Sequence, residues 1–154
     1  MNVRKPVDYG TMHRELTAIL AQNLPQMEEV YAIGKLINQR PEKGAAVAAA
    51  EFLQANFPDR TGFSPRNVRR MRDFYRTYEN DQTLLRLAKK IGWTLNVVIM
   101  EAELTREQRI SCLRKVASKK LSKKKLLEII LNGVFAEEPV DASDKICYNI
   151  TNPS

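Results

Sequence analysis

The sequence is most informative about the fold over residues 62–78, which read Gly-Phe-Ser-Pro-Arg-Asn-Val-Arg-Arg-Met-Arg-Asp-Phe-Tyr-Arg-Thr-Tyr. Ser64 followed by Pro65 is typical of a helix start. A serine side chain caps the unpaired amides of the first turn, and proline suits the first helical position. The pattern therefore predicts a helix that begins at Pro65 and runs to about Tyr78.

At 100° per residue this helix has two distinct faces. One face is apolar and can bury four large side chains, each contributing about 1.5–3 kcal/mol; its members are Val68, Met71, Phe74, Tyr75 and Tyr78. The opposite face carries Asp73, Thr77 and five arginines, namely Arg66, Arg69, Arg70, Arg72 and Arg76. An ordinary solvated face mixes lysine with glutamate, whereas the planar guanidinium group can bind phosphate through two hydrogen bonds. We interpret the arginine face as a phosphate-binding surface, with a solvated face as the alternative.

Outside this helix as well, apolar residues recur at spacings of three and four nearly throughout the chain, which indicates an all-α fold. Seven or eight short helices are expected: residues 11–38 with an interruption at Pro25, then 45–56, 65–78, 81–90, 94–103, 106–118 and 122–132. The expected N-caps are Asp81, Thr94, Ser122 and a capping box from Thr105 to Gln108, and Gly92 is the expected stop after the helix that Asp81 begins. A glycine such as Gly34 inside a helical pattern costs stability unless a neighbour packs closely on it.

Residues 1–135 are predicted to form one compact helical domain, and the acidic, non-periodic residues 136–154 are predicted to form a mobile tail. The helix over residues 45–56, a loop and the helix over residues 65–78 form a helix-turn-helix-like arrangement. Its loop is longer than the usual three or four residues.

The net charge of +7 is confined to two segments, which is the electrostatic pattern expected for a polyanion partner. Residues 59–76 hold six arginines and two aspartates, and residues 106–125 hold nine basic side chains and one acid. The second segment includes a lysine cluster around a short turn: Lys119, Lys120, Lys123, Lys124 and Lys125. Cations at a helix N-terminus are opposed by the helix dipole, and a bound anion would offset that repulsion. A solvated loop with snorkelling lysines is the alternative interpretation.

Two side chains near the arginines have alternative roles. Asn67 could read adenine, but it follows Ser64 by three residues, and we favour a role in closing the helix start. Trp93 could stack on a base, but a lone tryptophan at a helix start is more often part of the core.

No catalytic, metal or cofactor site is expected. His13 is the only histidine, and Cys112 and Cys147 are too far apart in sequence to indicate a zinc site, so both are expected to be free thiols in a reducing cytoplasm. The glycines do not form a phosphate-binding loop. Neither a signal peptide nor an apolar run of about 20 residues is present, which indicates a cytoplasmic protein that does not enter a membrane.

Several strings occur in an order that resembles the N-terminal helical domain of the bacterial YhcG family. They are Ile33-Gly34, Phe57-Pro58, Gly62-Phe-Ser-Pro-Arg-Asn67, Met71-Arg-Asp-Phe-Tyr75 and Trp93-Thr94, and the resemblance covers roughly residues 13–133. In that family the domain usually precedes a nuclease domain of the PD-(D/E)xK type, which implies DNA as the target. The chain stops about where that nuclease domain would begin, so the family's catalytic residues have no counterpart. Leu95 and Asn96 also stand where the family tends to have a histidine.

These observations predict a non-catalytic, cytoplasmic DNA-binding module, in which the five arginines and the five lysines contact phosphates. The alternative is a protein-interaction module that partners or regulates a nuclease or defence complex. A homodimer is compatible with either function, because many helical DNA binders are two-fold symmetric.

Overall fold

The computed structural model describes residues 7–133, and within that range the fold consists of eight helices and no strands. The helices are α1 (Gly10–Ala21), α2 (Gln26–Asn38), α3 (Ala45–Asn56), α4 (Pro65–Tyr78), α5 (Gln82–Ala88), α6 (Trp93–Glu101), α7 (Arg106–Lys119) and α8 (Lys123–Asn132). The expectation of an all-α domain of seven or eight short helices is confirmed. The predicted tail over residues 136–154 lies outside the described residues, so the division into domain and tail stays a prediction.

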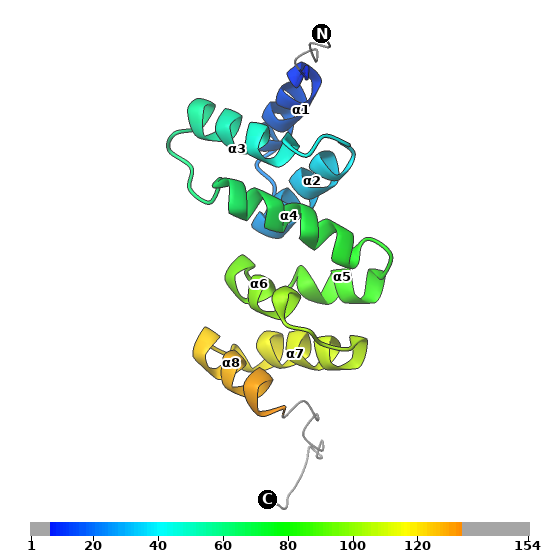
Figure 1. The fold of residues 1–154 in the computed structure, drawn as a ribbon. Coiled ribbons are helices and arrows are strands. Elements are labelled where there is room, and N and C mark those ends of the chain that lie inside the picture. Colours follow the sequence, from blue (N-terminus) through cyan, green and yellow to red (C-terminus); the bar gives the residue numbers. More distant parts are fainter. Residues whose placement is uncertain (1–6, 134–154) are drawn as a thin grey trace, which may run out of the picture.

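The helices follow one another in space roughly as they do in sequence, from α1 at one end of the molecule to α8 at the other (Figure 1). The helix α4 lies in the middle of this stack. It packs most extensively against α2 and α3, and it also contacts α5 and α6, while α8 packs against α6. The apolar face predicted for α4 is confirmed for Val68, Met71, Phe74 and Tyr78, which are all buried, whereas Tyr75 is only partly buried.

Local capping signals explain most of the helix boundaries. The side chains of Ser64, Asp81 and Ser122 each accept a hydrogen bond from the main-chain amide three residues later. Thr105 and Gln108 form the predicted capping box, with the two reciprocal hydrogen bonds at 3.1 and 2.9 Å. These residues satisfy helix amides that would otherwise lack a partner.

The predicted boundary at the start of α6 is wrong. Thr94 is not an N-cap, because α6 begins one residue earlier, at Trp93, after Gly92 in extended conformation. The reason is the buried side chain of Asn96, whose amide nitrogen donates to the carbonyl oxygens of Ala88, Ile91 and Gly92 at 2.8–3.2 Å. That amide satisfies carbonyls at the end of α5, which stops at Ala88 instead of the predicted Lys90. The α5–α6 connection is thus held by a side chain from the following helix.

Candidate nucleic-acid interface

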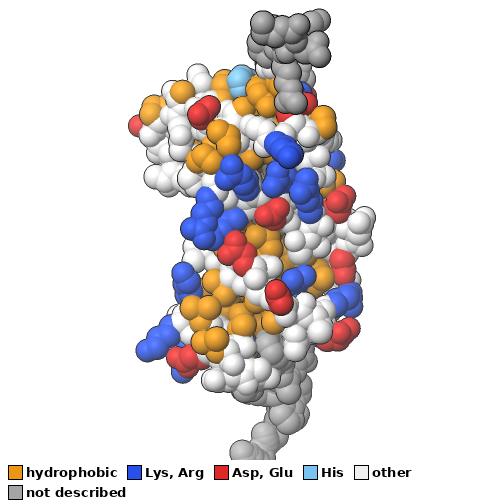
Figure 2. Space-filling view, in the orientation of Figure 1, with side chains coloured by type: hydrophobic (Ala, Val, Ile, Leu, Met, Phe, Trp, Pro, Cys, Tyr) orange, Lys and Arg blue, Asp and Glu red, His pale blue; other side chains and the backbone are white. Residues whose placement is uncertain are grey.

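Basic side chains gather over the middle of the molecule, where α4 lies, and acidic side chains are interspersed among them (Figure 2). Arg66 and Arg69, in the first turn and a half of α4, are exposed to solvent. Neither side chain forms an ion pair with another residue of the described range 7–133. These two guanidinium groups are available to an external anion.

The other three arginines are engaged with the protein itself. Arg70 binds Glu101 of α6 through two hydrogen bonds of 2.8 and 3.2 Å, and Arg76 donates to the side chain of Asn38 in α2. The side chain of Arg72 is only 23% exposed and lies 3.8 Å from Asp73. Because α2 and α6 pack on either side of α4, the open part of the arginine face is narrower than the helical wheel alone indicates.

The lysine cluster lies around the turn that joins α7 to α8, and all five of its members are exposed: Lys119, Lys120, Lys123, Lys124 and Lys125. Lys120 adopts a left-handed conformation (φ 50°, ψ 51°) at the end of α7, which turns the chain within three residues into α8. The first turn of α8 holds no acidic residue. Glu128 lies 3.9 Å from Lys125, which is at the edge of ion-pair range. The cluster is therefore a dense patch of positive charge at a helix N-terminus.

Asn67 has the structural role that its position predicts. Its amide nitrogen donates to the carbonyl oxygen of Gly62, which has a positive φ of 86°, and its side-chain oxygen accepts a hydrogen bond of 2.9 Å from the indole of Trp93. Trp93 packs edge-on against Phe74, with ring centroids 5.9 Å apart. With its donor and acceptor satisfied inside the protein, Asn67 ties the start of α4 to the start of α6.

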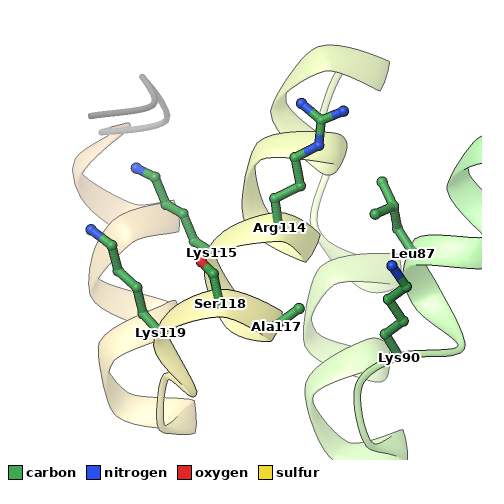
Figure 3. A pocket seen from close by; sticks show the side chains of 7 residues that line it. All are labelled: Leu87, Lys90, Arg114, Lys115, Ala117, Ser118 and Lys119. Atoms are coloured by element: carbon green, nitrogen blue, oxygen red, sulfur yellow. The ribbon is translucent and has the colours of Figure 1, made fainter. Parts of the chain in front are cut away.

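Packing of α5 against α7 brings together further cations that the candidate site did not include. A groove of about 570 Å³ is lined by Lys90, which follows α5, and by Arg114 and Lys115 of α7, together with Lys119 (Figure 3). Arg114 and Lys115 are visible in the sequence as part of a basic segment. Lys90 carries no such signal, since it lies 24 residues away from Arg114 in the chain.

The remaining chemistry of the described range is sparse. No group of three or more His, Cys, Asp or Glu side chains within residues 7–133 could hold a metal ion. Cys112 is a free, buried thiol whose pKa is raised by burial, so it is a poor nucleophile. His13 stacks on Phe52 with ring centroids 4.2 Å apart. None of the helices in this range is both long and apolar enough to span a bilayer.

The fold and its exposed cations define a basic, all-helical domain built around the central helix α4, which buries one face and exposes part of the other. The family model of the DUF1016 N-terminal domain matches residues 13–137, which is most of the chain. The chain therefore belongs to the DUF1016 N-terminal domain family, which is the N-terminal domain of the YhcG family, and the resemblance seen in the sequence is confirmed. No curated protein and no solved structure matches it.

Proposed function

We propose that this domain is a non-catalytic DNA-binding module that contacts the phosphate backbone through the lysine cluster and the open arginines of α4. The observation that carries the proposal is the exposure of all five lysines around the α7–α8 turn, with three of them in the first turn of α8. Like charges at this spacing repel one another, and the helix dipole adds to the cost. A polyanion would relieve both effects.

The geometry of the turn favours a duplex as the polyanion. Two helices joined by three residues resemble a helix-turn-helix, in which the N-terminal residues of the second helix approach the major groove. In this chain those residues are Lys123, Lys124 and Lys125. Lysine acts on phosphate as a flexible point charge, so we expect affinity without strong sequence preference.

Arg66 and Arg69 supply a second group of phosphate contacts. Both are exposed, whereas Arg70 and Arg76 already bind acceptors within the protein. We therefore rank Arg66 and Arg69 above Arg70, Arg72 and Arg76 as DNA contacts. The resemblance to a family whose N-terminal domain usually precedes a nuclease favours DNA over RNA.

The test is fluorescence anisotropy of a labelled random duplex at 50 and 200 mM salt. Each neutralised phosphate contributes about 0.9 to the slope of log K against log salt concentration, so changing Lys123, Lys124 and Lys125 to Gln should lower the slope by roughly 2–3. Changing Arg66 and Arg69 to Gln should lower it by roughly 1–2. The wild type should show no cleavage of the duplex in the presence of Mg²⁺.

A control for the lysine cluster is the change of Lys35 and Lys43 to Gln, which removes two positive charges. Both side chains are exposed, and α2 and the segment before α3 lie toward the other end of the stack of helices from the α7–α8 turn (Figure 1). This variant loses the same kind of charge and should keep nearly the whole slope. If the wild type binds neither duplex nor single strand at 50 mM salt, DNA binding is rejected. If the control and the lysine-cluster variant lose affinity equally, binding is non-specific attraction to net charge.

A further inference from the structure

The helix α8 leaves part of its apolar surface exposed. It lies at one end of the stack of helices and packs against α6, with Leu126 buried (Figure 1). Leu131, in contrast, is 82% exposed, and Leu127 is 39% exposed. Single exposed leucines need no explanation, but these two are four residues apart and are therefore adjacent on one face of the helix.

The same face of α8 carries one of its lysines. Lys124, Leu127 and Leu131 follow one another at intervals of three and four residues, so they form a single line along the helix, which we call the α8 stripe. The neighbouring lysines, Lys123 and Lys125, fall on either side of the stripe, since successive residues are about 100° apart around a helix. The stripe is thus apolar over two turns and basic at its N-terminal end.

The charges of α8 oppose its helix dipole. Three lysines and no acidic residue occupy the first turn, where the partial charge is positive, and within residues 123–132 no basic residue occupies the last turn, where it is negative. The one acidic residue of the helix, Glu128, lies mid-helix, 3.9 Å from Lys125. A second helix of the same sequence, running in the opposite direction, would bring its lysine-bearing first turn beside the last turn of the first helix. Each end would then gain the opposite charge that it lacks.

We infer that the α8 stripe is a contact surface between two copies of this chain, with the two α8 helices antiparallel about a two-fold axis. Leu127 of each copy would pack against Leu131 of the other, because a two-fold interface makes every contact twice. Lys124 of each copy would lie beside the C-terminal end of the other helix. Lys123 and Lys125 would stay at the edge of the contact, accessible to other partners. The inference does not rest on DNA binding.

The first test is the oligomeric state of the full chain without DNA. Two leucines from each copy make a small interface, so we expect a weak dimer with a Kd on the order of 10–100 µM. Sedimentation velocity at concentrations on either side of that value measures it. Leu131→Ser should raise the dimer Kd by about tenfold or more, because each dimer loses two buried leucines. The matched control is Val7→Ser, which removes an exposed apolar side chain before α1 and should leave the Kd unchanged.

Two further measurements test the antiparallel orientation. Lys124→Glu should raise the dimer Kd by about threefold or more, whereas Lys125→Glu, the same change in the same turn but off the stripe, should have a smaller effect. Circular dichroism checks that each variant folds. In a mixture of ¹³C-labelled and unlabelled wild-type chains, intermolecular nuclear Overhauser effects should join the methyl groups of Leu127 and Leu131, and this measurement needs no substitution.

Three results would overturn the inference. The wild-type chain could sediment as a monomer over the whole concentration range. The intermolecular effects could join Leu127 to Leu127 of the other copy, which would show a parallel pair and contradict the charge argument. Finally, the Leu131 methyl groups could show contacts only within their own chain, which would assign the stripe to an intramolecular partner. None of these results depends on DNA, so each would leave the proposed function standing.

Discussion

The α-carbon of Gly34 in α2 lies so close to the backbone of α4 that a Cβ atom at position 34 would be 2.1 Å from the carbonyl oxygen of Met71. The same atom would also lie 2.7 Å from the Met71 carbonyl carbon and 3.1 Å from the Cβ atom of Tyr75. This contact lies in the most extensive helix–helix interface of the described fold. The absence of a side chain at position 34 therefore sets how closely the two central helices approach.

We expect Gly34→Ala to destabilise the protein by at least about 2 kcal/mol. Alanine favours an isolated helix by about 1 kcal/mol over glycine, but a main-chain carbonyl cannot move aside as a flexible side chain can, so α2 and α4 must separate. Urea unfolding followed by circular dichroism measures the change. The control is Gly92→Ala, where an added Cβ meets nothing within 4 Å and the cost should stay below about 1 kcal/mol. Equal effects at the two positions would contradict the packing argument.

The hydrogen bond between Asn67 of α4 and Trp93 of α6 should couple the stability of these two helices. Asn67→Ala removes the acceptor of the Trp93 indole and the donor to the Gly62 carbonyl, and we expect a loss of about 1–3 kcal/mol in the free energy of unfolding. A double-mutant cycle with Trp93→Phe should give a coupling of about 0.5 kcal/mol or more. The affinity of the folded variant for duplex DNA should be unchanged. A fall in affinity with unchanged stability would instead support base reading by Asn67.

Glu101 should restrain DNA binding through Arg70. Glu101→Gln leaves the guanidinium of Arg70 without its carboxylate partner, so, if the proposed function holds, duplex affinity at 50 mM salt should rise by about two- to fivefold. Stability should change by less than about 1 kcal/mol, because half of the Glu101 side chain is exposed. Glu51→Gln, an exposed position in α3 with the same change in net charge, serves as the control. A similar rise for both variants would trace the effect to net charge alone.

The buried hydroxyl of Tyr78 should make stability depend on pH in the alkaline range. Burial raises the pKa of Tyr78 from 10.0 to about 12, although the charge of Arg109 acts in the opposite direction. Because the pKa is higher in the folded state, the associated stability is complete below about pH 10 and is lost as the pH rises through 12. The loss is on the order of 2–3 kcal/mol.

Tyr78→Phe isolates this effect from the titration of other groups. The hydroxyl has no hydrogen-bond partner within residues 7–133, so its removal should be neutral or stabilising by up to about 1 kcal/mol at pH 7. The difference in unfolding free energy between variant and wild type should then widen in favour of phenylalanine between pH 9 and 11.5. Parallel pH curves for the two proteins would show that Tyr78 does not ionise differently on folding.

Signals within a few residues of each other made most of the fold predictable. Ser64 with Pro65, Thr105 with Gln108, and Ser122 each mark a helix start through contacts three residues apart, and all of them are confirmed. The prediction for Thr94 was wrong because the buried side chain of Asn96 fixes the end of α5 and the start of α6. The preference of threonine for N-cap positions carries no information about this hydrogen bond between Asn96 and the end of α5.

For the candidate interface, the sequence predicted which basic residues are present but not which of them are exposed and unengaged. The sequence shows that α4 has an arginine face, but the pairing of Arg70 with Glu101 joins residues 31 positions apart. The groove lined by Lys90 and Arg114 likewise depends on how α5 and α7 pack. Neighbouring helices determine which cations remain accessible to a partner, and a helical wheel of α4 does not represent those neighbours.

Periodicity and capping contacts between near neighbours in the chain were enough to predict the helical class, most of the helix boundaries and the apolar face of α4. The two basic segments are visible in the sequence directly. The packing of the helices, in contrast, was needed to show that Gly34 lies against the Met71 carbonyl, that Asn67 binds Trp93, and which arginines of α4 stay exposed. Those contacts arise when whole helices cross. The angle and depth of a crossing depend on the packing of many side chains at once, which no local pattern specifies.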